Sequence, residues 1–262
     1  MKILLLRALT LGFLAMPATA SATDVKFLLC FPGGPGSTAD AQPVVDAFLK
    51  ALAGQAGWGS ASGTYTNDLA QCQSGAGGAG VVVLPLDLYL QQHTAWRLTP
   101  VATLTNKETA SRYHVVTKKG TTLDALKGKP VSTAIPASDA FLSRVGFDGK
   151  LDVSKDIALS RVRTALKALK DLDKGVVSAV LLDDVQQKAL AGLPFAASLE
   201  TVLSGAALPG AIVASVGAVQ GLGPALTGLC SKATKVCDDM RITGFQPIDA
   251  AALAALGKKL TP

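Results

Sequence analysis

The sequence predicts an α/β protein with two lobes. Apolar segments typical of buried strands alternate with segments of helical periodicity along most of the chain, which favours parallel or mixed sheets with helices on both faces. The alternation restarts near Asn106–Arg112 and near Ser204–Pro209, which indicates that the chain leaves one lobe and later returns to it. The 262 residues, of which 49% are hydrophobic, are enough for one large or two small domains.

Residues 1–22 are expected to be a secretory signal peptide. Lys2 and Arg7 give a positively charged start, the short apolar run Leu9–Met16 follows, and small residues place the cleavage site near Ala20 or Ala22. The apolar run is well short of the roughly 20 residues that span a membrane, which argues against a membrane anchor. We therefore expect an exported protein without stable membrane insertion.

In the first half of the chain, each expected strand ends where a helix is expected to begin. The strand Val25–Phe31 runs into a Pro/Gly turn, and Ser37-Thr38 can cap the helix Ala39–Ala53, whose apolar residues have helical spacing. The wholly apolar Val81–Leu84 is typical of a strand buried in a parallel sheet. The other expected elements are a strand at Trp58–Thr66, a helix starting at Asn67-Asp68, a helix at Leu86–Gln92 and an extended segment at Leu98–Thr105.

The second half repeats this rhythm. Thr164–Leu172 has the apolar spacing of an amphipathic helix, and the apolar strand Val176–Leu182 follows it. The other expected strands or extended segments are Tyr113–Thr117, Val131–Ala134, Leu151–Leu159 (as loop or edge), Pro194–Leu203, Ala211–Val216 and Arg241–Ile248. The other expected helices are Thr122–Leu126, Ser138–Val145, Asp183-Asp184 through Leu190, Gly223–Cys230 and Ala250–Leu256, with a turn between the last two cysteines.

Charge and motifs exclude several classes of function. Removal of Lys2 and Arg7 would leave 23 basic residues against 19 acidic ones, a net charge of about +4. The basic residues are scattered and few aromatics interleave with them, so nucleic-acid binding is not expected. Neither a G-x-S-x-G nor an H-E-x-x-H motif is present, so we expect no enzyme and no cofactor, although the two histidines leave a Ser/His/Asp arrangement open.

The four cysteines of an exported chain indicate disulfides, and four cysteines allow three pairings. Cys230 and Cys237 are close in sequence, so a local bridge between them is favoured, which leaves Cys30 for Cys72. That second bridge requires the end of the first strand to lie near the helix that starts at Asn67-Asp68. A metal site is not expected, because the chain has no C-x-x-C pair and only two histidines.

Three stretches resemble a known family. Tyr113–Gly120 is followed by Thr122–Lys129, which ends in Leu-Lys-Gly-Lys; Lys174–Asp184 combines a glycine with an apolar strand that ends in acidic residues. The third stretch is the apolar return strand Leu208–Ala214, with Gly244–Ile248 near the chain's end. In this order the segments resemble the two-lobed, type II periplasmic solute-binding proteins, specifically the phosphate- and phosphonate-binding branch related to PhnD.

The resemblance implies a periplasmic monomer whose lobes are joined by two crossing strands. One lobe would comprise residues 23–106 and 206–262, and the other residues 107–205. The resemblance further implies that a small anionic ligand (phosphate, phosphite or phosphonate) binds in the interlobe cleft by hinge closure and is delivered to the permease of an ABC transporter. The alternatives are a periplasmic accessory or sensor protein that reuses the fold without transport, and, less favoured, a secreted hydrolase.

Ligands of open α/β sheets bind beyond the carboxyl ends of strands, where helices begin. Hydroxyl and backbone N–H groups at such places can hold an oxyanion without any lysine or arginine. The expected ligand contacts are Gly36, Ser37, Thr38 and Tyr89 on one wall, Ser132, Thr133, Ser138 and Asp139 on the other, and Asp183 toward an amine or hydroxyl of the ligand. As alternatives, Ser37, Ser138 and Asp183 are ordinary helix caps and Tyr89 a packing residue.

Overall fold

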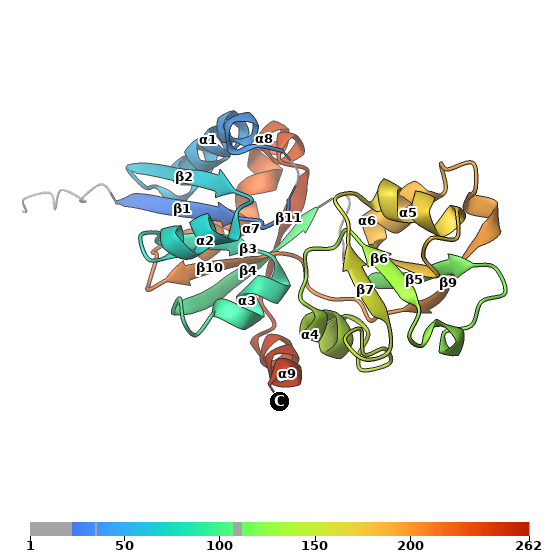
Figure 1. Cartoon of the computed structure of the whole chain (residues 1–262). Coiled ribbons are helices and arrows are strands. Elements are labelled where there is room, and N and C mark those ends of the chain that lie inside the picture. Colours follow the sequence, from blue (N-terminus) through green and yellow to red (C-terminus); the bar gives the residue numbers. More distant parts are fainter. Residues whose placement is uncertain (1–22, 35, 107–111, 262) are drawn as a thin grey trace, which may run out of the picture.

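The computed structural model describes residues 23–34, 36–106 and 112–261, which form two α/β lobes lying side by side (Figure 1). The predicted signal peptide lies outside the described residues. None of the described helices combines the length and apolar character needed to cross a membrane. Each lobe is built on one mixed sheet, which confirms the α/β class with two sheets and flanking helices.

The first lobe, called here the six-stranded lobe, has the strand order β11-β4-β10-β3-β1-β2. Its strands are β1 (Asp24–Cys30), β2 (Ser60–Thr66), β3 (Val81–Leu84), β4 (Leu98–Asn106), β10 (Ile212–Val216) and β11 (Ile242–Pro247). The strands β1, β2 and β3 run parallel, while β10 and β11 are antiparallel to their neighbours. The last two strands, β10 and β11, thus belong to the same sheet as β1–β4, although the whole five-stranded lobe separates them in sequence.

Helices cover both faces of this sheet because strand residues alternate between two apolar cores. On one face, Phe27 and Leu29 pack with the helices α1 (Thr38–Ala56), α7 (Leu222–Lys232) and α8 (Thr234–Asp239). On the other, Leu28 packs with α2 (Leu69–Ala76) and α3 (Leu86–Gln92). The expected turn between Cys230 and Cys237 is wrong, because α8 begins there directly after α7.

The second lobe, called here the five-stranded lobe, has the strand order β7-β6-β8-β5-β9. Its strands are β5 (Tyr113–Lys118), β6 (Pro130–Thr133), β7 (Ala158–Arg161), β8 (Ala179–Asp183) and β9 (Leu199–Ser204). The helices of this lobe are α4 (Asp139–Phe141), which continues as a π-helix over Leu142–Gly146, then α5 (Ala165–Asp173) and α6 (Asp184–Leu190). Short 3₁₀ turns lie at Asp124–Leu126 and Ala196–Ser198.

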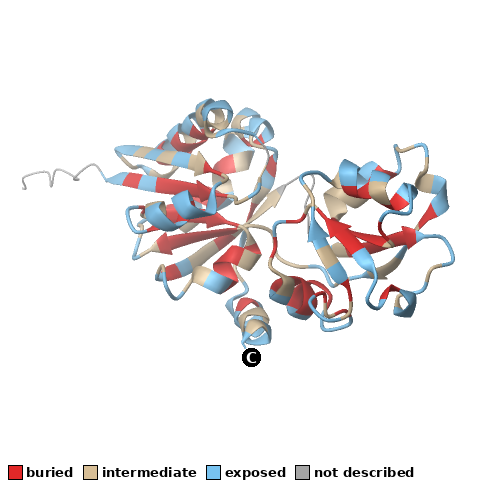
Figure 2. Ribbon diagram, in the orientation of Figure 1, coloured by how far each residue is buried: buried red, intermediate tan, exposed pale blue. Residues whose placement is uncertain are grey.

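The last described helix, α9 (Ala250–Leu260), follows β11 of the six-stranded lobe. Figure 2 shows buried residues concentrated along the strands of both lobes.

Two glycines flank the segment that leads from β9 back to β10. The Gly205 N–H donates to the Tyr113 carbonyl (2.8 Å), and the Leu104 N–H donates to the Ala211 carbonyl (2.7 Å). A Cβ on Gly205 would lie 1.9 Å from the Gly146 carbonyl oxygen, and one on Gly210 would lie 2.1 Å from that of Leu104. Both contacts are with backbone, so only glycine fits at either end of this crossing.

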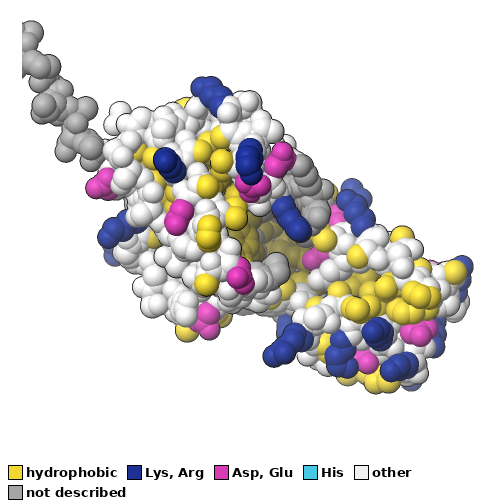
Figure 3. All heavy atoms as spheres, turned by 90° about the horizontal axis from the view of Figure 1, so that it is seen from above, with side chains coloured by type: hydrophobic (Ala, Val, Ile, Leu, Met, Phe, Trp, Pro, Cys, Tyr) yellow, Lys and Arg dark blue, Asp and Glu magenta, His cyan; other side chains and the backbone are white. Residues whose placement is uncertain are grey.

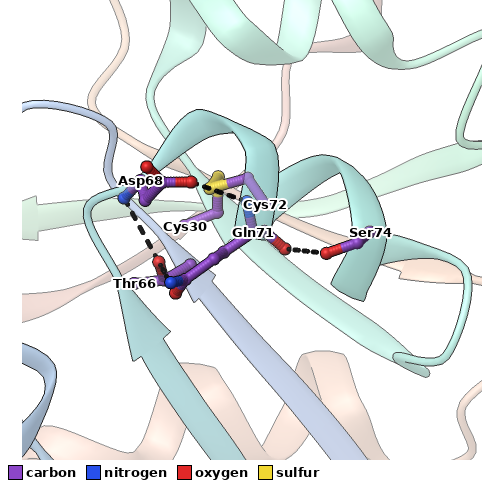
Figure 4. Close-up of a disulfide and its surroundings, with 6 residues drawn as sticks. All are labelled: Cys30, Thr66, Asp68, Gln71, Cys72 and Ser74. Carbon is purple, nitrogen blue, oxygen red and sulfur yellow. Dashed lines mark hydrogen bonds between the residues drawn. A yellow bond between two sulfur atoms is a disulfide. The ribbon is translucent and has the colours of Figure 1, made fainter.

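The structure confirms both favoured disulfides. Cys30 at the end of β1 is bonded to Cys72 in α2, and Cys230 in α7 is bonded to Cys237 in α8. Figure 4 shows the first bridge beside the turn that starts α2, where the Asp68 carboxylate accepts from the Gln71 N–H at 2.8 Å. The bridge therefore ties the end of β1 to helix α2, which packs on one face of the sheet.

Candidate functional site

Two cavities lie between the lobes and share Asp87 as a lining residue. The larger, of about 280 Å³, is lined by Pro32, Leu69, Pro85, Leu88 and Gln91 of the six-stranded lobe and by Pro136, Ala137, Ser138 and Arg161 of the five-stranded lobe. The smaller, of about 170 Å³, is lined by Phe31, Leu86, Leu104, Tyr113, Phe141 and residues 208–211. Figure 3 shows the surface hollowed between the lobes, with hydrophobic side chains on its floor.

Asp87 links the lobes across this cleft. It lies in the first turn of α3, and its carboxylate accepts hydrogen bonds from the Ser138 backbone N–H (2.9 Å) and hydroxyl (3.2 Å). The Gln91 amide donates to the same carboxylate and, at 3.2 Å, to the Ser138 hydroxyl. Ser138 is the N-cap of α4, which is the alternative role that the sequence offered for it, and accepts from the Phe141 N–H. A carboxylate of one lobe thus occupies the N-terminal turn of a helix in the other, where anions are stabilised.

The predicted contact Asp139 lies next to this turn and forms an ion pair with Arg161 at 2.6 Å. Arg161, at the end of β7, also donates to the Ala137 carbonyl at 2.6 Å, so its guanidinium spans the start of α4. Both side chains of the pair are partly exposed, so the pair contributes little stability, and Arg161 lines the larger cavity.

The hydroxyls of Ser132 and Thr133 are used inside the five-stranded lobe. Ser132 is buried and its Oγ lies 3.0 Å from that of Ser160 on β7. Thr133 is also buried; it donates to the Leu181 carbonyl at 3.1 Å and accepts from the Ile135 N–H at 3.0 Å. These bonds join β6 to its neighbours, and neither residue lines the two cleft cavities.

The predicted ligand-binding wall, residues 36–38, lies at the start of helix α1. The Ser37 hydroxyl accepts from the Asp40 N–H (3.2 Å) and donates to the Asp40 carboxylate (2.7 Å), while the Gly36 carbonyl accepts from the Asn67 amide (2.8 Å). Thr38 is the first helical residue. None of these three residues lines the two cleft cavities, to which this loop contributes Phe31 and Pro32.

Tyr89 and Asp183 also have partners within their own lobes. Tyr89 is buried in α3, where its ring stacks on that of His93 at 5.2 Å and faces a cavity next to α9. Asp183 caps α6 and forms a reciprocal capping box with Gln186. Burial raises the pKa of the Asp183 carboxyl above its ordinary value. No group of three or more His, Cys, Asp or Glu side chains along the described residues is placed to hold a metal ion.

Tyr113 brings a second electrostatic feature to the smaller cavity. Its ring meets Phe141 edge-on, with ring centres 6.0 Å apart. Burial raises the pKa of the Tyr113 phenol well above its usual range, and the negative charges of Asp87 and Asp183 raise it further. The phenol is therefore a neutral hydrogen-bonding group, and the two carboxylates give this part of the cleft a negative potential.

No protein-family model matches the sequence, and no curated protein matches it as a relative. Solved structures do match it. XAC2383 from Xanthomonas citri, solved with chloride and with ATP, has a TM-score of 0.69 over 90% of this chain and 97% of its own, at 16% and 15% identity respectively. The binding-protein component of an ABC phosphonate transporter from Pseudomonas aeruginosa has a TM-score of 0.61 over 91% of this chain and 86% of its own, at 14% identity.

PhnD1 from Prochlorococcus marinus, solved with methylphosphonate, has a TM-score of 0.60 over 92% of this chain and 99% of its own, at 13% identity. The fold is that of the periplasmic solute-binding proteins. At these identities the likeness shows the fold alone, and the ligands in the neighbours' structures belong to those proteins. In this binding-protein fold, the cavities that share Asp87 lie where the two lobes face each other.

One further polar chain lies at the base of the five-stranded lobe. His114 Nδ1 lies 2.9 Å from the Ser204 hydroxyl and Nε2 lies 2.7 Å from the Asp184 carboxylate. This is the Ser/His/Asp combination that the sequence left open. It joins β5, β9 and the start of α6 within the five-stranded lobe, and the two cleft cavities are lined by other residues.

The tyrosines give a pH prediction. Burial raises the pKa of Tyr65 and Tyr89 as well as that of Tyr113, and these are the chain's three tyrosines. The unfolded chain releases phenolic protons near pH 10, whereas the folded chain holds them to higher pH. The contribution of the buried tyrosines to the free energy of unfolding is therefore fully present below about pH 10. It decreases as the pH rises beyond that value.

Phenolate absorbance and unfolding, followed on the same sample, would check this expectation. We expect no tyrosine to ionise near pH 10 while the protein is folded. The control is Tyr113→Phe, which should weaken the pH dependence of unfolding by removing the tyrosine with the largest shift. Native-state titration of all three tyrosines at the ordinary pKa would contradict the prediction.

Proposed function

We propose that the chain is an exported solute-binding protein that captures a small oxyanion between its lobes and presents it to an ABC importer in the periplasm. The proposed lobes are residues 23–106 with 206–262, and residues 107–205. The fold supports the general role, since a two-lobed structure with cavities between its lobes can enclose a small solute.

The observation that carries the oxyanion proposal is the Asp87 carboxylate in the Ser138 turn. A backbone N–H and a hydroxyl of one lobe already hold two carboxylate oxygens of the other. Phosphate and phosphonate oxygens accept hydrogen bonds from the same donors. In the proposed cycle the lobes separate, a ligand oxyanion takes the place of Asp87 at Ser138, and the lobes close on it.

The proposed site is therefore smaller than the one predicted from the sequence. Ser138 contributes the donors, and Gln91 and Arg161 line the larger cavity beside it. We assign structural roles to the Ser37, Ser132 and Thr133 hydroxyls, because each is engaged in a hydrogen bond within its own lobe. Tyr113 and the apolar residues around it limit the size of the solute that the inner part of the cleft accepts.

An Asp87→Asn variant tests this proposal. The neutral amide competes less well than the carboxylate for the Ser138 N–H and hydroxyl, and it removes a negative charge from the ligand's path. We expect affinity for the preferred oxyanion to rise about tenfold, which is about 1.4 kcal/mol. Calorimetric titration with phosphate, phosphite, methylphosphonate and aminoethylphosphonate would measure it in both proteins.

The matched control is Asp40→Asn. Asp40 is likewise a first-turn carboxylate of the six-stranded lobe that is hydrogen-bonded to a serine N-cap, but it does not line the cleft cavities. Asp40→Asn changes the net charge by the same amount as Asp87→Asn. An equal gain in affinity in both variants would therefore mean that the gain comes from net charge alone. If neither the wild-type protein nor Asp87→Asn binds any of the four anions, oxyanion capture is wrong.

A further inference from the structure

Helix α9 makes a further, non-covalent connection between the lobes. It follows β11 of the six-stranded sheet, with Asp249 as its N-cap accepting from the Ala252 N–H at 2.9 Å. In Figure 1 the helix leaves the six-stranded lobe and lies below α3, with α4 of the other lobe beside it. Helix α9 therefore reaches beyond the lobe to which β11 belongs.

The C-terminal end of α9 is bound to the five-stranded lobe. The Arg144 guanidinium in the π-helix donates to the Leu260 carbonyl at 2.8 Å, and the Lys259 ammonium pairs with the Asp148 carboxylate at 2.5 Å. Leu253 is buried, and Leu256 and Leu260 pack against an apolar core that contains residues of both lobes. One helix is thus attached to both lobes.

The hydrogen bond from Arg144 has a specific physical effect. The last carbonyl groups of an α-helix have no donor within the helix, and the helix C-terminus favours positive charge. Arg144 supplies both the donor and the charge from the other lobe. If the lobes separate where α9 lies, the helix loses its Arg144 cap and its ion pair with Asp148. Leu256 and Leu260 also lose part of their apolar packing.

Packing of α9 against its own lobe is incomplete. A cavity of about 720 Å³ lies between α3 and α9, lined by Tyr89, Leu90, His93, Pro100, Leu253, Ala254, Gly257 and Leu260 among others. The side of α9 that faces α3 therefore has room to shift, whereas its far end is fixed by a hydrogen bond and an ion pair. The contacts with the five-stranded lobe therefore hold α9 in place, and separation of the lobes would have to break them.

We propose that α9 is a strap that holds the lobes together and sets how readily the cleft opens. Its effect on ligand access rests on the proposed function, but the strap itself is a property of the free protein. Asp87 and Gln91, which hold Ser138 across the cleft, lie on α3, the helix that faces α9. The strap and the Asp87 contact therefore restrain the same movement from two places.

The test measures interlobe distance without ligand. All four cysteines are in disulfides, so spin labels can be placed selectively through Lys50→Cys on α1 and Lys170→Cys on α5, both exposed. In the full chain carrying these labels, Lys259→Asp reverses one charge of the pair with Asp148. We expect the population at long interlobe distance, measured by pulsed electron paramagnetic resonance, to rise about threefold, as suits a half-exposed ion pair.

The swap Lys259→Asp with Asp148→Lys restores the pair with its charges exchanged, so it should bring the distance distribution back toward that of the wild-type protein. Lys258→Asp makes the same charge change one residue away and should leave the distribution unchanged. The strap proposal is wrong if Lys259→Asp leaves the distance distribution unchanged. It is also wrong if the charge swap fails to restore the distribution in a protein of normal thermal stability. Because no ligand is present, failure of oxyanion binding is a separate result.

Discussion

Replacing Cys30 and Cys72 by alanine is expected to lower the free energy of unfolding by about 4 kcal/mol. The bridge joins residues 42 positions apart, so it removes many conformations from the unfolded chain. The Cys230–Cys237 bridge spans 7 positions, and the same chain-entropy relation gives about 2.5 kcal/mol for its removal. Loop length therefore predicts that the first bridge contributes more.

Chemical denaturation of the two double-alanine variants, followed by circular dichroism, would measure the difference. Both Cys30 and Cys72 are fully buried, so alanine also leaves a small void in the apolar core, which acts in the same direction. Each double variant serves as the control for the other, because both remove two sulfur atoms and one bridge. Equal losses in the two would mean that loop length does not govern the contribution.

The fold was largely predictable from local patterns. Val81–Leu84 and Leu86–Gln92 are found with the expected bounds, because a wholly apolar strand and an apolar helix are separated by a proline. Helix α8 was missed because it has six residues and no side chain caps its start. The helix expected at Ser138–Val145 begins as predicted but continues as a π-helix from Leu142, beside the close contact of Gly146 with Gly205.

The site was harder to predict, because its key contact joins distant parts of the chain. Ser138 has a recognisable N-cap pattern, and its hydroxyl and N–H do face the cleft. Leu86–Tyr89 was expected beside the first wall, but Asp87 within it is not singled out by the sequence, because a carboxylate in a first helical turn is common and its partner lies 51 residues away in the other lobe. The hydroxyls of Ser132 and Thr133 bond to β7 and β8, and nothing in the local sequence orders those strands.

A Gly205→Ala variant is expected to lose about 3 kcal/mol of unfolding free energy. The new Cβ would lie 1.9 Å from the Gly146 carbonyl oxygen, so the π-helix or the crossing segment must move as backbone. Movement of Gly146 is itself limited, because a Cβ there would already approach the Tyr113 ring at 3.0 Å. The strain therefore reaches the residue that lines the inner cleft.

Gly223→Ala in helix α7 is the matched control for this substitution. The nearest atom to its new Cβ is a Val101 methyl at 3.8 Å, an ordinary contact, so the gain in helix propensity should leave stability unchanged or raise it by up to about 1 kcal/mol. Denaturation curves of the two variants would then move in opposite directions or differ by several kcal/mol. If they coincide, the crossing tolerates a side chain at Gly205, and the close approach of Gly205 to the Gly146 carbonyl does not limit the residue type there.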